Sequence, residues 1–308
     1  MATPREPIIG FVLGTGRCGS SLVHEVLARH PSIGFLSNVD DRLSLPVGLS
    51  RWNSPIYQRV PVAWTRKGRL RFAPSEGYRI LEKQVSPALV APCRDLVAAD
   101  ATPWLGKRFA VFFQRQASAQ DVPLFLHKFT GWPRVGLIDA ALPEARFIHV
   151  VRDGRAVANS LVQMPWWDGY GGPSAWSWGP LPSRYEAEWN ASDRSFPVLA
   201  GLEWKILIDA FETAKASIPS ARWHEVRYED VLDDPRRRIE EILRFLGLTW
   251  TDRFERSFDR YAFGHDRADA YRRELDARDF SALDASLGEH LERFGYPVSD
   301  NRDEAVST

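Results

Sequence analysis

A glycine-rich segment near the start of the chain has the composition of an anion-binding loop. It reads GTGRCGSS over residues 14–21, so four residues separate Gly14 from Gly19. In a phosphate loop this spacing lets backbone N–H groups wrap an anion at the start of a helix. Nucleoside triphosphatases carry a lysine after the second glycine, whereas this chain has Ser20 there and Arg17 within the loop. The segment therefore predicts a phosphate-like ligand other than a magnesium nucleotide triphosphate, and no set of metal ligands is expected.

A second segment, RFIHVVRDGRAVANSL, predicts another phosphate contact. Its strand-like run ends at Arg152, and Ser160 follows eight positions later in the sequence. Eight residues are about two helical turns, so both side chains are expected to point along one helix face. A guanidinium and a hydroxyl placed in this way would bind one phosphate. Together with the first loop, the segment predicts a ligand that carries phosphates at two separate places.

The order of elements along the chain indicates how these motifs are positioned. Short apolar runs alternate with segments of helical periodicity, which is typical of parallel strands joined by crossover helices. The expected strands are residues 8–13, 125–127, 147–151 and 223–228, and the expected helices include residues 20–29, 199–214 and 234–246. The pattern predicts an α/β fold: a single P-loop-like domain over residues 1–298, with a central, mostly parallel sheet flanked by helices. Residues 299–308 are expected to form a disordered tail.

Composition excludes several classes of protein. The 308 residues carry 40 Lys and Arg against 40 Asp and Glu, and a chain without net charge is not expected to bind nucleic acid as its main partner. Two cysteines, Cys18 and Cys93, cannot form a disulfide framework and indicate a reducing compartment, for which we expect the cytoplasm. No stretch approaches the ~18 apolar residues of a membrane span, and the N-terminal segment lacks a signal-peptide pattern. The oligomeric state is not indicated.

The two motifs and a third segment, VRYEDVLDDPRRRIEEILRFLGL, occur in the order found in a known enzyme family. From Ile9 to about Leu248 the chain resembles the sulfotransferases that use 3'-phosphoadenosine 5'-phosphosulfate (PAPS). Its motifs are more similar to those of the bacterial and Golgi-type branches of this family than to those of the cytosolic branch. The resemblance implies in-line transfer of a sulfuryl group from this donor to an acceptor hydroxyl, without a metal. The implied donor-site residues are Arg17, Cys18, Gly19, Ser20 and Ser21 for the 5'-phosphosulfate, Arg152, Ser160 and Arg272 for the 3'-phosphate, and Tyr228 near the adenosine.

The resemblance also implies a catalytic lysine. Lys128, in FLHKFTGWP, lies at the position of the family's lysine, where an ammonium neutralises the bridging oxygen of the leaving phosphate. Arg17 and the loop amides would supply further positive charge on the same side. Both residues are therefore expected to take part in the chemical step.

The general base has several candidates. Relatives of the tyrosylprotein type use a glutamate two residues before an arginine, and in LSNVDDRLSLP this position is Asp40. The cytosolic branch uses a histidine two residues after the lysine, where this chain has Thr130, so that arrangement is disfavoured. Two histidines of suitable intrinsic pKa are the alternatives, namely His127 and His24, of which His24 is expected to face solvent. We expect Asp40 to be the base, with His127 as the second choice.

Two segments outside the nucleotide motifs are expected to contact the acceptor. Residues 44–75 contain no Asp or Glu and carry six Arg and Lys residues, and residues 164–182 contain four tryptophans among Gly and Pro. Insertions over residues 44–120 and 164–198 are therefore predicted to act as acceptor-side lids. The tryptophans expected to line the acceptor pocket are Trp166, Trp167, Trp176 and Trp178. Aromatic rings and positive charge favour a hydroxylated amphiphile such as a lipid or glycolipid, with transient contact to a membrane surface.

Two other functions stay open on the sequence alone. A phosphotransferase of the nucleoside kinase type also begins with strand, glycine-rich loop and helix, although the missing lysine after Gly19 speaks against it. The other is a nucleotide-binding scaffold without turnover, which the presence of Arg17, Lys128 and Arg152 disfavours.

Overall fold

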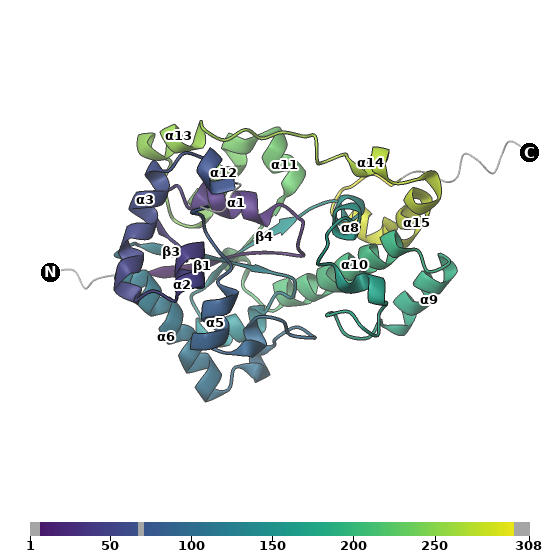
Figure 1. Cartoon of the computed structure of the whole chain (residues 1–308), viewed down its shortest axis with the longest axis horizontal. Coiled ribbons are helices and arrows are strands. Elements are labelled where there is room, and N and C mark those ends of the chain that lie inside the picture. Colours follow the sequence, from purple (N-terminus) through teal and green to yellow (C-terminus); the bar gives the residue numbers. More distant parts are fainter. Residues whose placement is uncertain (1–6, 67–70, 299–308) are drawn as a thin grey trace, which may run out of the picture. The chain divides into compact units, whose positions relative to one another are not determined.

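The computed structural model describes residues 7–66 and 71–298 (Figure 1). The chain forms two compact units. Unit 1 consists of Met1–Val151 and Ala210–Gly264, and unit 2 consists of Arg152–Asp209 and His265–Thr308. The sequence did not anticipate this division, and the single domain over residues 1–298 stays a prediction. The expected tail at residues 299–308 lies outside the described residues.

Unit 1 is built on a five-stranded sheet in the order β2-β3-β1-β4-β5. The strands are β1 (Ile8–Gly14), β2 (Ile33–Gly34), β3 (Leu124–Thr130), β4 (Arg146–Val151) and β5 (Trp223–Arg227). All neighbouring pairs are parallel, as the alternation of strands and helices predicts. The apolar runs of β1, β3 and β4 are buried on both faces, which is why they read as continuous hydrophobic stretches. The expected α/β class with a mostly parallel central sheet is confirmed.

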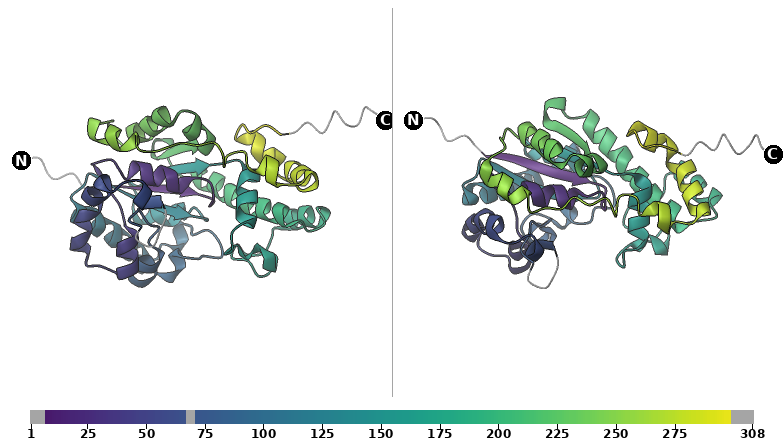
Figure 2. Two further views of the ribbon diagram at one scale, coloured as in Figure 1. Left: turned by 45° about the horizontal axis from the view of Figure 1, so that its top comes forward. Right: turned by 90° about the horizontal axis from the view of Figure 1, so that it is seen from above.

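Helices cover both faces of this sheet (Figure 2). The helices of unit 1 are α1 (Ser20–Leu27), α2 (Asn38–Leu43), α3 (Asn53–Arg59), α4 (Ala63–Arg66), α5 (Tyr78–Gln84), α6 (Pro103–Gln120), α7 (Val135–Ala141), α11 (Tyr228–Asp233), α12 (Pro235–Phe245) and α13 (Asp252–Phe258). Short 3-10 turns lie at η1 (Val47–Trp52), η2 (Pro87–Leu89), η3 (Ala98–Asp100) and η5 (Ser220–Arg222). The segment expected to be a lid over residues 44–120 is thus largely helical.

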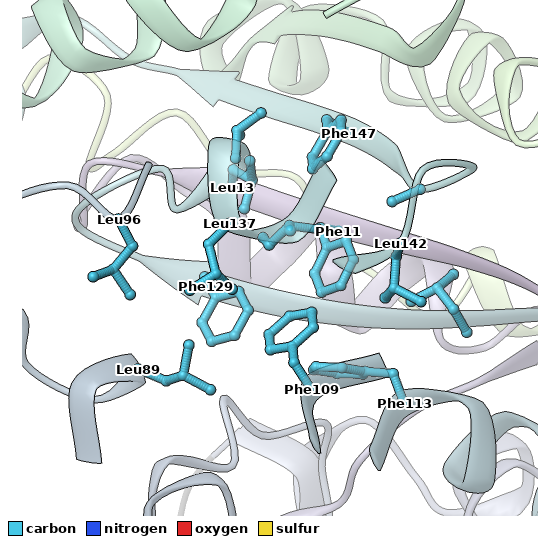
Figure 3. Packing of buried hydrophobic residues seen from close by; sticks show 14 of the residues in the cluster. Phe11, Leu13, Leu89, Leu96, Phe109, Phe113, Phe129, Leu137, Leu142 and Phe147 are labelled. Carbon is cyan, nitrogen blue, oxygen red and sulfur yellow. The ribbon is translucent and has the colours of Figure 1, made fainter. Parts of the chain in front are cut away.

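The core on one face of the sheet is aromatic. Phe11 of β1 packs edge-on against Phe113 of α6 with ring centroids 5.3 Å apart, and it stacks with Phe129 of β3 at 5.9 Å. Figure 3 shows these rings between the sheet and α6. Helix α6 therefore belongs to the core of unit 1, because its buried face completes this aromatic cluster. The opposite face of the sheet packs on aliphatic side chains of α1 and α12.

Unit 2 is helical. It contains α8 (Gly154–Val162), α9 (Ser183–Ala191), the first part of α10 (Phe196–Ala216), α14 (Tyr271–Glu274), α15 (Ala277–Arg293) and the turn η4 (Asp168–Gly171). Helix α8 packs against α14 and α15. A buried ion-pair cluster joins these helices, because Arg155 contacts Asp153 at 2.7 Å and Asp284 at 2.6 Å.

Candidate active site

The glycine-rich loop connects β1 to α1, as its sequence predicts. Gly16 and Gly19 both have φ of 87°, a left-handed conformation that favours glycine. Space is limiting as well, since a Cβ on Gly14 would lie 2.3 Å from Sγ of Cys18. A Cβ on Gly19 would lie 2.1 Å from the ring of Tyr228. The glycines thus make a close-fitting turn whose N–H groups precede the positive end of the α1 dipole.

The other loop residues differ in exposure. Arg17 is exposed and adopts φ of 54°, which is uncommon for a residue with a side chain and costs of order 1–3 kcal/mol. Cys18 is fully buried, so its side chain packs in the core rather than facing a ligand. Ser20 is buried and Ser21 is exposed at the first turn of α1. An exposed, strained arginine beside the N–H groups at the start of a helix is an arrangement suited to an anion.

Lys128 lies beside this loop. It sits on β3, where it is in register with Val12 of β1, and Gly14 is in register with Thr130, so both strands end at one edge. The Nζ atom of Lys128 donates a hydrogen bond to Oγ of Ser21 at 2.9 Å. The structure therefore brings together the predicted lysine and the end of the predicted phosphate loop, although more than a hundred residues separate them.

The partner of Lys128 on its other side is Glu76, which sequence reasoning missed. Lys128 and Glu76 form an ion pair, and the side chains are only 9% and 24% exposed. Thr130 donates its hydroxyl to Oε1 of Glu76 at 2.6 Å. Burial raises the pKa of Glu76, but the charge of Lys128 and hydrogen bonds from Lys128, Thr130 and Tyr78 outweigh it and lower the pKa to about 2. Glu76 is therefore a carboxylate at neutral pH.

Non-local pairing places Glu76 at this position. Pro74 forms an antiparallel bridge with Ser37, and the N–H of Ser75 donates to the carbonyl oxygen of Leu36 at 2.8 Å. The segment therefore runs beside the continuation of β2 and ends next to β3. One signal was present in the sequence, because Glu76 is the first acidic residue after the acid-free stretch of residues 44–75.

Lys128 and Glu76 line a cavity of about 340 Å³. Its lining residues are Ser21, His24, Glu25, Asn38, Asp41, Arg42, Arg71, Pro74, Ser75, Glu76, Gly77, Tyr78 and Lys128. Three basic and three acidic side chains other than histidine are among them, so the cavity has no net charge. The lining includes Ser21, so a bound molecule would reach the residue at the end of the phosphate loop.

His24 also lines the cavity, but it does not face solvent as expected. Its side chain is buried, and Nε2 lies 3.2 Å from the carbonyl oxygen of Leu126. Burial and the nearby charge of Lys128 lower the pKa of His24 to about 3. The imidazole is therefore neutral at physiological pH, and the expectation that it is a solvent-facing histidine is wrong.

Asp40, the expected base, has a structural role at the start of α2. Its Oδ2 accepts hydrogen bonds from the backbone N–H of Ser37 at 2.9 Å, from Oγ of Ser37 at 2.6 Å and from Nδ2 of Asn53 at 2.6 Å. Together with the bond from its own N–H to Ser37, this is a capping box. Asp40 is buried and is not among the residues that line the cavity, whereas the next residue, Asp41, is. The geometry therefore argues against Asp40 as a base.

His127, the second choice, lies on the opposite face of β3 from Lys128. Its ring packs 5.0 Å from Phe113 and 4.7 Å from Phe129, and it is fully buried. Neither ring nitrogen has a hydrogen-bond partner among the described residues. Burial lowers the pKa of His127 well below its ordinary value. Because side chains alternate across a strand, the residue next to the lysine points into the aromatic core instead of the cavity.

The residues expected at the 3'-phosphate lie in unit 2. Arg152 is buried, and its Nη2 donates to the carbonyl oxygen of Arg267. Ser160 is half-buried on α8, the helix against which α14 packs, and the exposed Arg272 lies on α14. Unit 2 therefore carries these three residues on or beside two packed helices, which is consistent with a shared contact to one group.

The four tryptophans expected to line the acceptor pocket also lie in unit 2, and they differ from one another. Trp167 and Trp176 are buried, with 5% and 6% exposure, whereas Trp166 is 62% exposed. Nε1 of Trp167 donates to Oε2 of Glu203 at 2.9 Å, and Trp178, which is half-buried, also bonds Glu203. Burial raises the pKa of Glu203 to about 8. Trp167 and Trp178 thus anchor their loop by hydrogen bonds, and the acceptor role of the tryptophans stays a prediction.

The described ranges, 7–66 and 71–298, contain no cluster of three or more His, Cys, Asp or Glu side chains able to hold a metal ion. Within the same ranges no helix has the length and apolar character to cross a bilayer.

Comparison with known proteins finds similarity to sulfotransferases. The omega-hydroxy-beta-dihydromenaquinone-9 sulfotransferases Stf3 of Mycobacterium bovis and Mycobacterium tuberculosis are each 22% identical over 326 residues, covering 93% of this chain and 74% of theirs. The sulfotransferase domain of the Synechococcus PCC 7002 olefin synthase has a similar fold, with a TM-score of 0.54, 19% identity, and coverage of 96% of this chain and 98% of that domain. Sulfotransferase STF9 of Mycobacterium avium has a TM-score of 0.55 at 16% identity, with coverage of 96% and 79%.

The decisive match is to a family model described as the sulfotransferase family, which covers residues 7–252. This range includes the phosphate loop, Lys128, Glu76 and the segment around Arg152. The chain belongs to the sulfotransferase family and is an enzyme that transfers sulfuryl groups.

Proposed function

We propose that this sulfotransferase moves a sulfuryl group from PAPS to a hydroxyl of a lipid-like amphiphile. The observation that carries the proposal is the position of Lys128, which contacts Ser21 of the phosphate loop on one side and Glu76 in the cavity on the other. A donor held by the loop and an acceptor held in the cavity would therefore meet at one ammonium group.

The loop fits the phosphosulfate end of this donor. Gly14 and Gly19 leave room that any Cβ would fill, and Arg17 with the N–H groups at the start of α1 supplies positive charge for an anion. Ser20 and Ser21 add hydroxyl groups. Tyr228 packs against Gly19 and is placed to contact the adenosine, while Arg152, Ser160 and Arg272 of unit 2 are proposed to hold the 3'-phosphate.

Bound PAPS supplies the sulfuryl group, and the chain supplies positioning, a proton acceptor and compensating charge. The acceptor oxygen attacks sulfur in line as the bond between sulfur and the bridging oxygen breaks. We propose that the acceptor proton passes to a carboxylate oxygen of Glu76, replacing Asp40 as the base. The bridging oxygen leaves with adenosine 3',5'-bisphosphate, and Lys128 neutralises its growing negative charge.

Because of the ion pair with Lys128, the strength of Glu76 as a base depends on whether donor is bound. Burial is the largest influence on its pKa and raises it, whereas the Lys128 charge lowers it. A donor phosphosulfate competes with Glu76 for the ammonium group of Lys128. Once Lys128 turns toward the donor, less of the effect of burial is offset, so the pKa of Glu76 rises and the carboxylate becomes a stronger base. Without donor, the paired carboxylate is a weak base.

The proposed class of acceptor is supported by the names of the relatives and by the size of the cavity. The mycobacterial relatives are named for omega-hydroxy-beta-dihydromenaquinone-9, a hydroxylated lipid. In this chain the cavity of about 340 Å³ is too small for a whole lipid, so it is proposed to take the hydroxyl-bearing end. A location in the cytoplasm remains part of the proposal, and the two free cysteines, Cys18 and Cys93, agree with a reducing compartment.

A transfer assay with labelled PAPS and a panel of lipid, sugar and phenol alcohols tests the proposal. With the best acceptor, Glu76→Gln should lower kcat by about 10²- to 10⁴-fold, as expected for loss of a general base. Calorimetry with adenosine 3',5'-bisphosphate should find that donor affinity is equal or higher in this variant, because the uncharged side chain no longer competes for the ammonium group of Lys128.

Asp40→Asn is the matched control. It should lower the melting temperature by disturbing the capping box, while the folded fraction keeps its turnover. If Asp40→Asn abolishes turnover and Glu76→Gln does not, the base assignment is wrong. If the protein responds to ATP with magnesium and not to PAPS, the donor assignment fails.

A further inference from the structure

Helix α6 presents a stripe of exposed side chains away from the aromatic core. Trp104, Arg108, Val111 and Arg115 are spaced by four, three and four residues, so they follow one another along one face of the helix. All four are exposed, with Trp104 at 59% and Val111 at 41%. The guanidinium of Arg108 lies 4.9 Å from the ring centre of Trp104. Apolar and cationic groups thus alternate along this face.

A second cavity, of about 550 Å³, opens beside this stripe. It lies between α6 and the chain that leads into η1, and its lining residues are Ser44, Leu45, Pro46, Val47, Gln84, Arg108, Val111, Phe112, Arg115 and Gln116. The lining includes two arginines and no acidic residue. Neither α6 nor residues 44–75 contain an Asp or a Glu, so both walls belong to acid-free segments.

The positive charge in this cavity is not balanced by the described protein. Arg108 donates to the carbonyl oxygens of Val85 at 3.1 Å and Gln84 at 2.6 Å, which are uncharged acceptors. Arg115 has no ion pair or hydrogen bond to a side chain or backbone group in the described ranges. The lining residue Gln116 is buried, and its Oε1 has no hydrogen-bond partner there either. An anionic group that also carries hydroxyls would satisfy both arginines and the amide oxygen.

Large exposed apolar side chains lie on η1, which packs against α6, and directly before the segment that lines the cavity. Leu43 is 66% exposed and directly precedes the lining residue Ser44, and Leu49 is 48% exposed just after Val47. Trp52, at the end of η1, is 51% exposed, and Arg51 lies 5.2 Å from its ring centre. Exposed leucines beside paired tryptophans and arginines are typical of surfaces that lie in a membrane interface.

We propose that this face of unit 1, formed by η1, the exposed side of α6 and the cavity between them, binds an anionic membrane surface and holds a phospholipid headgroup. The exposed leucines and tryptophans favour a bilayer over a free anion, because a soluble phosphate would leave them in water. The inference deepens the proposed function, since a membrane is where a lipid-like acceptor would be met. It is nevertheless tested without donor or acceptor, so either proposal can fail alone.

Vesicle sedimentation of the full chain tests the proposal. The wild-type protein should bind vesicles of phosphatidylcholine containing about 30% phosphatidylglycerol and should not bind pure phosphatidylcholine vesicles. Reversing two charges, in Arg108→Glu/Arg115→Glu, should weaken binding by about tenfold or more. Because Arg108 has structural hydrogen bonds, Arg115→Glu alone is the second variant, with about fivefold weaker binding expected.

Arg253→Glu/Arg256→Glu on α13 is the matched control. Both arginines are exposed, and neither has an ion pair among the described side chains, so this variant changes the net charge equally. Vesicle binding should be nearly as strong as in the wild type. Equal losses in the two double variants would mean that net charge alone attracts the protein, and the proposal would be overturned. It would also be overturned if the wild-type protein bound no vesicles. A rise of its melting temperature with millimolar glycerol phosphate that is lost in Arg115→Glu would then point to a free anion as the ligand.

Discussion

Two glutamates, the half-buried Glu76 in unit 1 and the buried Glu203 in unit 2, show how the surroundings of a carboxyl group decide its chemistry. Glu76 faces the ammonium group of Lys128 and accepts from Thr130, and its pKa is lowered to about 2. Glu203 is only 2% exposed and accepts from indole N–H groups such as that of Trp167. With no described cation beside it, burial raises the pKa of Glu203 to about 8.

The difference lies in the counter-charge, because burial alone disfavours a carboxylate in both places. Glu76 is ionised at neutral pH and can accept a proton. Glu203 is mostly protonated at neutral pH and serves as an anchor for the tryptophan-rich loop. Hydrogen bonds from neutral indoles offset only part of the cost of burying a charge at Glu203, whereas the ammonium group of Lys128 and the hydroxyl donors Thr130 and Tyr78 together offset more than all of it at Glu76.

The largest effect is expected when the cation beside Glu76 is removed, and this change tests the comparison of the two glutamates. Lys128→Met should make Glu76 resemble Glu203, so the pKa of Glu76 should rise and kcat should fall by about 10³-fold through loss of charge at the leaving oxygen. In the wild type the lowered pKa contributes stability above pH 4.5 that is lost as the pH falls through about 2. This acid-dependent loss should be absent in Lys128→Met, as measured by urea unfolding across pH.

Lys83→Met on α5 is the control for that variant, because Lys83 is an exposed lysine of the same unit. It should change neither kcat nor the pH dependence of unfolding. An unchanged acid response in Lys128→Met would mean that Lys128 does not set the pKa of Glu76.

Substitutions in the tryptophan-rich loop that contacts Glu203 are expected to have the next largest effect, on the free energy of unfolding. Trp167→Ala should lower the free energy of unfolding by about 3–5 kcal/mol, because it removes a buried ring and one of the hydrogen-bond donors to Glu203. Trp166→Ala, at an exposed ring, should change it by about 0.5 kcal/mol or less. Urea unfolding followed by circular dichroism measures both. A Trp167→Ala protein that stays stable and shows only a raised KM for the acceptor would favour a pocket role instead.

The smallest expected effect concerns the proton on Glu203. A raised pKa contributes stability below the unfolded value of 4.5 that is lost as the pH rises through about 8. Glu203→Gln has no proton to lose, so it should gain stability relative to the wild type by about 1.4 kcal/mol for each pH unit between the unfolded pKa of 4.5 and the folded pKa of about 8, and the difference should level off at higher pH. Melting temperatures at acidic, neutral and alkaline pH measure this difference. A constant difference between the two proteins at every pH would mean that Glu203 is already ionised.

Much of the donor-binding part of the site could be predicted from the sequence, because it depends on residues that are close together in the chain. A strand, a glycine-rich turn and a helix follow one another within residues 8–27, and the glycines are required by the φ angles and close contacts of that turn itself. The parallel sheet follows from apolar runs that alternate with helical segments. Lys128 was predicted from the resemblance to the sulfotransferases that use PAPS, and the structure brings it to Ser21.

The residues on the acceptor side of the site could not be predicted in this way, because they are brought together by contacts between segments that are distant in the sequence. Counting along the chain led to Asp40, but α2 turns that carboxylate to its own N-terminus, and the alternation of β3 turns His127 into the aromatic core. The carboxylate that reaches Lys128 comes from Glu76, which the pairing of Pro74 with Ser37 carries to the sheet edge. Sequence alone determined the order of the motifs along the chain and the anion-binding loop, because backbone conformation and periodicity are local. Tertiary structure decided which carboxylate could act as a base, because the pKa depends on burial and on which charge lies beside it.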